Sequence, residues 1–296
     1  MVADTVYGAG SVRRYRPTTD ELQSRRQALV EIVADAAPTG VRFVYYRAVS
    51  KGLFPKTQNG YERVQRDLML LRESGAIPWT HIVDSSRWMR KPTTWGSVEE
   101  MLADASASYR RDLWRNADTR VEVWCESESV AGVIGSETFT WDVPLFPIKG
   151  QTSASFAHAA AMEYRADPRP VVIYYVGDLD PAGVEIELTL AKKLRDFSGR
   201  PDVQVIRLAC TSEQVQTLQL VGTNPKKNTY FDAATGTRRS WAGQAVEVEA
   251  IDAPVLRELV SAAITSHIDP DQLRITQMVE ESERQGLLAM ARGWSV

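Results

Sequence analysis

Cysteine and histidine are scarce in this chain of 296 residues, which has two cysteines and three histidines. Cys125 and Cys210 lie far apart, and each ends an apolar run. This placement favours buried, reduced thiols over a disulfide or a metal site. The histidines, His81, His158 and His267, are scattered without the spacing of a zinc site or of a Ser-His-Asp triad. Zinc enzymes and serine hydrolases are therefore disfavoured.

A long apolar run is also missing. No stretch approaches the roughly 20 residues needed to cross a bilayer, and the first residues lack the basic-then-apolar pattern of a signal peptide. Apolar residues make up 44% and charged residues 25% of the chain, as in globular proteins with one large or two ordinary domains. We therefore expect a cytoplasmic protein without a membrane-bound part.

Strong net charge is absent too, because the formal charge at neutral pH is only −3. The charges are nevertheless unevenly distributed. Residues 1–118 carry 18 Lys and Arg against 14 Asp and Glu, whereas residues 119–296 carry 17 against 24. The N-terminal part is thus the better candidate for contact with phosphates, and carboxylates gather in the C-terminal part.

The most informative stretch is residues 171–183, with the sequence VVIYYVGDLDPAG. Its β-branched and aromatic first half predicts a strand buried on both faces, as in a parallel sheet. Pro181 suits the first turn of a helix, and apolar residues at helical spacing follow it. Asp178 and Asp180 are therefore expected on a strand-to-helix turn.

A second predicted strand, at 121–125, ends at Glu126, and Glu128 follows two residues later. Ligands of open α/β sheets bind at the carboxyl ends of the strands, where neighbouring carboxylates repel one another unless a cation or proton intervenes. Because Mg²⁺ prefers oxygen ligands, we expect Glu126, Asp178 and Asp180 to bind it. Glu128 is a candidate for a supporting role or for a second metal ion. The simpler alternative is a turn in which Asp180 caps the helix.

Strand and helix patterns alternate over residues 119–296. Strands are predicted at 121–125, 143–148, 171–176 and 203–208, and helices at about 153–164, 181–197 and 211–219. This alternation predicts an α/β fold with a parallel sheet. Two further helices, at 254–268 and 270–290, are expected to cover the sheet or an interface.

Helical patterns dominate the part that follows residues 1–17, a polar, Arg-rich segment expected to be a flexible arm. Thr18 and Glu21 form a capping box before the first helix, and a second helix follows Gly40. The remaining predicted elements are a helix at 61–74, a strand at 79–83, a basic and aromatic loop at 87–92 and a connecting helix within 97–118. Helices followed by a strand and a basic loop are typical of a winged-helix DNA-binding domain, expected over 18–96.

Two adjacent tyrosines in the second helix have different predicted environments. Tyr45 shares the apolar stripe that begins at Val41, whereas Tyr46 lies about 140° from Val41, next to Arg42 one turn earlier. We therefore expect Tyr45 to be buried and Tyr46 to be exposed with a cation beside it. The alternative is that Tyr46 is an ordinary surface tyrosine.

Basic residues suited to nucleic-acid contact occur in four places. They lie on the third helix, in the loop after the predicted strand, after the second sheet strand, and in the polar insert at 222–243, where aromatic residues accompany them. The candidates are Arg63, Arg66, Arg87, Arg90, Lys91, Lys149, Lys226, Lys227, Arg238 and Arg239. Solvated surface charge is the alternative for Arg63, Arg66 and Lys149, and a mobile surface loop is the alternative for the insert.

Two motifs together resemble a known family. Glu126 followed by residues 178–183 (DLDPAG), and residues 42–46 (RFVYY), are similar to the A subunit of topoisomerase VI and the transesterase that makes meiotic double-strand breaks. The chain resembles most the short, stand-alone A-type proteins of mobile elements. The resemblance implies a winged helix followed by a Toprim-type parallel sheet with helices on both faces. It also implies that Tyr46 attacks DNA to form a 5′-phosphotyrosyl link, with Arg42 at the phosphate and Glu126 able to handle a proton.

The resemblance also implies partners. Double-stranded DNA is the substrate, and two tyrosines for two strands imply a homodimer, in which the tyrosine meets the metal of the partner subunit. The sequence has no Gly-rich ATP-binding motif, so ATP-driven strand passage would need a separate ATPase subunit. Two alternatives remain open: a metal-dependent nuclease that uses water, and a non-catalytic DNA-binding protein.

Overall fold

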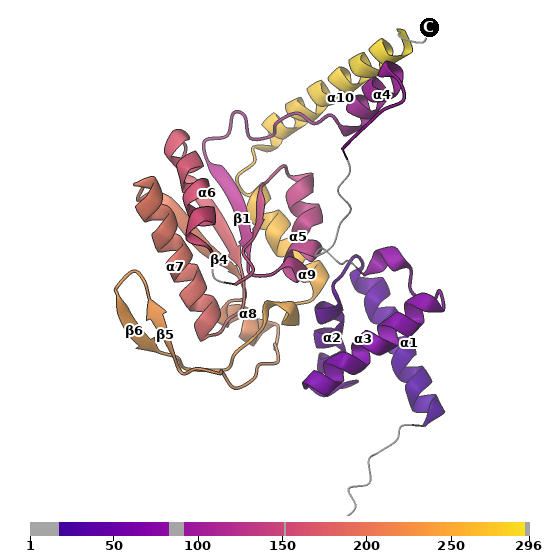
Figure 1. Ribbon diagram of the computed structural model, residues 1–296, viewed down its shortest axis with the longest axis vertical. Helices are drawn as coiled ribbons and strands as arrows, with labels where there is room; N and C mark the ends of the chain where they lie inside the picture. Colours follow the sequence, from indigo (N-terminus) through magenta and orange to yellow (C-terminus); the bar gives the residue numbers. More distant parts are fainter. Residues whose placement is uncertain (1–17, 83–91, 151, 294–296) are drawn as a thin grey trace, which may run out of the picture.

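The computed structural model describes residues 18–82, 92–150 and 152–293. The expected N-terminal arm at 1–17 lies outside the described residues, and so do Arg87, Arg90 and Lys91 of the basic loop. The described chain forms a small helical body, a larger α/β body and a helical pair that projects from the latter (Figure 1).

The α/β body is built on four parallel strands, which confirms the expected α/β fold with a parallel sheet. They are β1 (Arg120–Cys125), β2 (Leu145–Pro147), β3 (Val171–Val176) and β4 (Val203–Ala209), in the order β2-β1-β3-β4. β1 and β3 lie in the middle and are almost entirely buried, as their continuous apolar sequences predict.

Helices cover both faces of this sheet (Figure 1). α6 (Ala154–Ala166) and α7 (Pro181–Ser198) lie on one face, and α5 (Glu128–Thr140) and α9 (Ala253–Thr265) lie on the other. Successive side chains of β1 alternate between the two cores: Val123 packs with α5 and α9, and Trp124 packs with α6 and α7. α5 was not predicted, although Ser127 caps its first turn. The short α8 (Ser212–Thr217) follows β4.

The helical body contains α1 (Thr19–Ala36), α2 (Val41–Ser50) and α3 (Gln58–Glu73). The capping box of Thr18 and Glu21 is present at the start of α1. α3 begins three residues before the predicted position, because the Thr57 hydroxyl accepts the Gly60 N–H at 3.1 Å and caps the helix there.

The strand predicted at 79–83 is wrong for its described residues. Trp79–His81 form a short 3₁₀ helix, and only Ile82 pairs in a parallel bridge, with Thr39. A lone extended segment is not stable without a neighbouring strand, and here the Trp79 ring lies 4.2 Å from the Arg72 guanidinium instead. The expected wing falls largely on residues outside the described ones, so the winged helix stays a prediction.

The connecting helix is shorter than predicted. α4 (Val98–Ser108) ends ten residues before 118. It packs along α10 (Pro270–Gly293) and does not form a continuous helix between the two bodies (Figure 1). The Ser106 hydroxyl donates to the Arg284 carbonyl at 3.0 Å, and Arg111 pairs with Glu283 at 2.7 Å. Of the two C-terminal helices, α9 covers the sheet and α10 does not. No helix within the described residues is long and apolar enough to span a membrane.

Candidate active site

The predicted acidic residues lie at the switch point of the sheet. β1 has β2 on one side and β3 on the other, and Cys125 is paired in register with Val176. Glu126 and Asp178 therefore follow these paired ends at the same carboxyl edge, where open α/β sheets bind their ligands. Asp180 is two residues further, at the start of α7.

One oxygen of each of these three carboxylates accepts a hydrogen bond from a backbone N–H. Glu126 Oε2 accepts from Asp178 N at 3.0 Å, and Asp178 Oδ1 accepts from Val248 N at 2.9 Å. Asp180 Oδ1 accepts from Gly183 N at 2.7 Å, so its role as a helix cap is real. The second oxygen of each carboxylate has no hydrogen-bond partner among the described residues.

Burial makes negative charge unfavourable at this edge. Burial, and next the charge of Glu126, raise the pKa of Asp178 to about 8. Burial also raises the pKa of Glu126, although the Asp178 N–H and the Arg207 guanidinium oppose that shift. Two carboxylates that are destabilised as anions would gain free energy from a nearby cation.

Their chemistry fits magnesium, because carboxylate oxygens are its preferred protein ligands. In the part of the chain that the structure describes, however, no three acidic, His or Cys side chains lie close enough together to form a metal-binding group. Glu126, Asp178 and Asp180 thus have the donor type and charge for Mg²⁺ but are not preassembled around it.

Arg207, which sequence reasoning missed, holds the loop that carries the two aspartates. Its Nη1 donates to the carbonyls of Gly177 at 3.1 Å and of Asp178 at 2.9 Å, and its Nε donates to Glu187 at 2.7 Å. The only signal in the sequence is one charged residue within a strand that is mostly apolar. Arg207 therefore acts on the position of Asp178.

Glu128 and Lys149, predicted separately for metal and phosphate binding, form an ion pair of 3.0 Å. The Lys149 side chain is 67% exposed, so this pair lies at the rim of the edge rather than inside it. A surface pair of this kind contributes little to stability and exchanges readily for another anion.

Tyr46 is buried, and the predicted exposure of this side chain is wrong. It is 7% exposed, and Tyr45 is 6% exposed. The helical stripe correctly identified the face of α2 that packs within its own body. Tyr46 also belongs to the core of the helical body, against which Ala250 of the α/β body packs, and it lines a cavity with Leu220 and Ala250. Helical periodicity cannot report packing against a second body.

Arg42 and Tyr46 face an acidic segment that sequence reasoning also missed. Arg42 pairs with Glu247 and, at 3.6 Å, with the buried Glu249. Burial opposes the charge of Arg42, but Glu249 and Glu247 together raise its pKa. Burial raises the pKa of the Tyr46 phenol, and Glu247, as a hydrogen-bond acceptor, raises it further. Acidic residues at alternate positions in an apolar stretch were the available signal.

The same segment is bound to the sheet edge. Leu179 N donates to Val246 O at 2.8 Å, and Val246 N donates back to Leu179 O at 3.0 Å. Val248 N donates to the Asp178 carboxylate. Within one chain, therefore, Glu247 lies beside Tyr46 and Arg42. The residues before and after it, Val246 and Val248, are hydrogen-bonded to the loop that carries Asp178.

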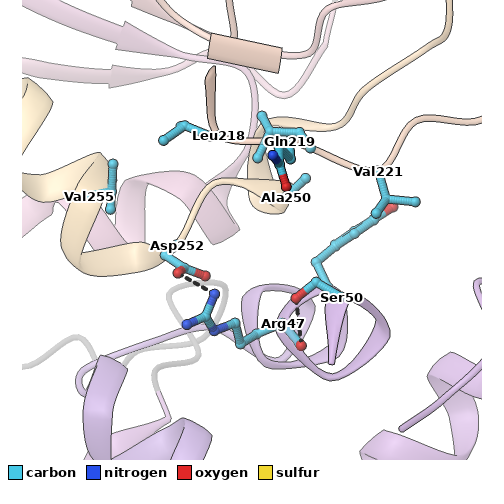
Figure 2. Close-up of a pocket in the computed structure, with 10 residues that line it drawn as sticks. Arg47, Ser50, Leu218, Gln219, Val221, Ala250, Asp252 and Val255 are labelled. Atoms are coloured by element: carbon cyan, nitrogen blue, oxygen red, sulfur yellow. Dashed lines mark hydrogen bonds and ion pairs between the residues drawn. The ribbon is translucent and has the colours of Figure 1, made fainter. Parts of the chain in front are cut away.

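Two cavities flank Tyr46. The larger, of about 340 Å³, is lined by Arg42, Tyr46, Lys56 and Glu247 among others, and Lys56 Nζ lies 4.9 Å from the centre of the Tyr46 ring. The smaller, of about 110 Å³, lies between α2 and the α/β body, where Arg47 reaches across to Asp252 at 2.6 Å (Figure 2). Two cations and a tyrosine in one open cavity suit an anionic ligand.

The predicted DNA-contacting residues are exposed where the structure describes them. Arg63 and Arg66 project from α3, and Lys226 and Lys227 lie in the insert. The insert contains a two-stranded hairpin, β5 (Thr229–Asp232) and β6 (Thr237–Ser240), that carries Arg238 and Arg239. Arg238 is exposed, and Arg239 pairs with Asp232 at 2.7 Å.

No protein-family model matches the chain, and no curated protein matches it in sequence. Function therefore has to be inferred from these side chains and their arrangement. Two features bear on function. One is the set of carboxylates at the switch point of the parallel sheet. The other is the cavity in which Tyr46, Arg42 and Lys56 lie beside the acidic segment that adjoins the sheet edge.

Proposed function

We propose that this protein is a DNA-cleaving transesterase of the topoisomerase VI A type, with a winged helix and a Toprim-like sheet, that uses Tyr46 as its nucleophile and requires Mg²⁺. One observation supports this most strongly. The Arg42 and Tyr46 side chains of α2 face the segment that is hydrogen-bonded to Asp178. The two motifs that carry the resemblance are far apart in the sequence, yet they meet across this one segment.

In the proposed reaction the Tyr46 oxygen attacks a DNA phosphorus atom. A Tyr46 O–P bond forms, the bond from phosphorus to the 3′-oxygen breaks, and the 5′ end stays attached to the protein. Because the new phosphodiester conserves the bond energy, attack by the 3′-hydroxyl can reverse the step. Arg42 and Lys56, which line the same cavity as Tyr46, would bind the phosphate oxygens.

Glu126, Asp178 and Asp180 would hold Mg²⁺, which supplies positive charge that stabilises the phosphate and the leaving 3′-oxygen. Glu128 is the candidate for a supporting role or a second ion. Arg207 fixes the backbone of the aspartate loop through the carbonyls of Gly177 and Asp178.

Covalent capture tests this proposal directly. Labelled supercoiled DNA is incubated with the protein and Mg²⁺, and the mixture is then denatured. We expect label on the protein and nicked or linear DNA only when Mg²⁺ is present. Cleavage without a covalent adduct would contradict the transesterase proposal.

Burial of Tyr46 supports a second candidate, a Toprim-type nuclease that activates water with the same carboxylates. That enzyme would cleave with free 5′ ends and would keep its activity when Tyr46 is replaced. A protein that binds DNA without any cleavage would instead be a non-catalytic DNA-binding factor. The capture experiment separates all three.

Double-stranded DNA and a homodimer are the proposed partners, with a separate ATPase subunit if strands are passed. The resemblance implies that Tyr46 works with the carboxylates of the partner subunit. In the single chain the two bodies are packed together: Phe43 of α2 belongs to the core with α5 and α9, and Arg257 donates to the Pro38 carbonyl at 2.9 Å. We therefore propose that each site is complete within one chain.

A mixture of Tyr46→Phe and Asp178→Asn chains tests this arrangement. Heterodimers have no complete site if each site comes from one chain, so we expect nicking to remain absent. Native mass spectrometry verifies the heterodimers. Recovery of nicking in the mixture, but in neither variant alone, would show that the tyrosine uses the partner's carboxylates.

Replacement of Arg63 and Arg66 by alanine is expected to weaken binding to all DNA sequences alike. For each phosphate that the protein no longer neutralises, the slope of log K against log salt should fall by about one. Fluorescence anisotropy over a salt series measures the slope. Arg274→Ala, at an exposed arginine of α10, is the matched control. An unchanged slope in the Arg63 and Arg66 variants would mean that these side chains face solvent in the complex.

A further inference from the structure

Glu247 has two partners that the proposed reaction needs. Its carboxylate pairs with the Arg42 guanidinium, and the Glu247, Arg42 and Tyr46 side chains all line the 340 Å³ cavity. Its own position is fixed, because the neighbouring residues Val246 and Val248 are hydrogen-bonded to the aspartate loop. It is 36% exposed in its side chain and thus open to the cavity.

Resting on the proposed function, we infer that Glu247 is the catalytic base that removes the proton from Tyr46. A phenol ionises near pH 10 in water, and it needs a proton acceptor to attack at neutral pH. Among the described residues that line this cavity, Glu247 is the one carboxylate. Glu249, the other carboxylate that pairs with Arg42, is almost entirely buried.

The arrangement couples substrate binding to activation of the base. Without DNA, Arg42 stabilises the charged carboxylate of Glu247. A DNA phosphate that enters the cavity offers Arg42 a second anion, and transfer of Arg42 to the phosphate frees the Glu247 carboxylate from its ion pair. The Glu247 carboxylate would therefore be free to accept the phenol proton when the phosphorus atom is within reach of Tyr46.

Proton transfer accompanies each direction of the reaction. The phenol proton moves to a Glu247 oxygen as the Tyr46 O–P bond forms, and the 3′-oxygen leaves with the electron pair of its bond to phosphorus and takes a proton from water. On resealing, the 3′-hydroxyl loses its proton to water, the 3′-oxygen to phosphorus bond forms again, and the phenolate recovers the proton of Glu247.

Several charged or titratable groups surround Glu247. They are Arg42, Tyr45 and Tyr46 of α2, Lys56 of the following loop, Asp178 of the aspartate loop and Glu249 of η2 (Val248–Ala250). Each of them persists in a Glu247→Gln variant, which also keeps the shape of the side chain. Arg42 retains Glu249 as a partner in that variant.

Glu247→Gln should lower the rate of covalent adduct formation by about 100-fold to 10,000-fold at neutral pH, the range for loss of general base catalysis. The remaining rate should rise with pH, by about tenfold per unit, because the phenol must then ionise unaided. A fluorinated tyrosine at position 46, with a more acidic phenol, should restore much of the rate in the Gln variant. It should have little effect in the native background.

Asp252→Asn is the matched control, since it breaks the Arg47–Asp252 pair across the same interface without touching Tyr46, and its rate should stay near that of the native protein. A native-like rate in Glu247→Gln would overturn the inference. So would a slow variant that neither higher pH nor the fluorinated tyrosine restores, because Glu247 would then only position Arg42. Absence of any adduct with the native protein is a different result, which contradicts the proposed function itself.

Discussion

Tyr46→Phe is expected to abolish covalent capture of DNA, whereas Tyr45→Phe is expected to retain it. The phenol of Tyr46 lines the cavity with Arg42 and Glu247. The Tyr45 hydroxyl instead donates to backbone carbonyls, to Thr57 at 3.1 Å and to Pro55 at 3.3 Å. Both side chains are buried, so their different roles follow from their hydrogen bonds and not from exposure.

Thermal stability should rank the two variants in the opposite order, because Tyr45→Phe, which keeps capture, is the one expected to lose stability. Tyr45→Phe removes hydrogen bonds to two carbonyls and should destabilise the fold by about 1 kcal/mol. Tyr46→Phe keeps the ring in place and removes only the hydroxyl at Glu247. Adduct formation on denaturing gels and thermal unfolding measure the two effects. Equal loss of capture in both variants, with both folded, would contradict the assignment of Tyr46.

Asp178→Asn should abolish cleavage and weaken binding of Mg²⁺, and Glu126→Gln and Asp180→Asn should do the same. Each replacement removes one charged oxygen donor from the proposed ligand set. Cleavage assays and titration with Mg²⁺ measure the effects, and Asp196→Asn, at an exposed carboxylate on α7, is the control. Native cleavage rates in any two of the three variants would contradict the metal site.

The pH dependence of stability gives a second test that needs no cleavage. The pKa of Asp178 is about 8 in the folded protein and about 3.8 when unfolded, so at intermediate pH the folded state holds a proton that the unfolded state has lost. This contribution to stability therefore falls as pH rises from about 4 to about 8. Without metal, Asp178→Asn should be more stable than the native protein at pH 8, by on the order of 1 kcal/mol for each pKa unit relieved.

The difference between the two proteins should shrink as pH falls toward 4 and below, where Asp178 is protonated in the folded state and becomes increasingly protonated in the unfolded state. Mg²⁺ should stabilise the native protein and not the variant, since a ligand stabilises the state that binds it. Thermal unfolding with EDTA and with Mg²⁺ checks both expectations. If Mg²⁺ does not change the thermal stability of the native protein at any pH, the ion does not bind at this edge of the sheet.

Sequence patterns determined the α/β body well, because its signals are local. The apolar run at 171–176 and the proline after Asp180 were sufficient to predict β3, the turn and α7 within one residue. Since all strands of a parallel sheet point the same way, placing Glu126 and Asp178 at strand ends also placed them at one edge. The order β2-β1-β3-β4, which puts the switch point between them, came from the structure.

The partners of Tyr46 were decided by tertiary structure alone. Periodicity placed Tyr46 outside the apolar stripe of its own helix and assigned it to solvent, whereas the structure places it in the core of the helical body, against which Ala250 of the α/β body also packs. Glu247, Glu249 and Arg207 carry no local motif. Antiparallel pairing of Leu179 with Val246 brings the segment with Glu247 and Glu249 to the sheet edge, and parallel pairing of β4 with β3 brings Arg207 there. Short-range patterns determined the elements and the carboxylates, and contacts between residues far apart in the chain decided which groups act on the tyrosine.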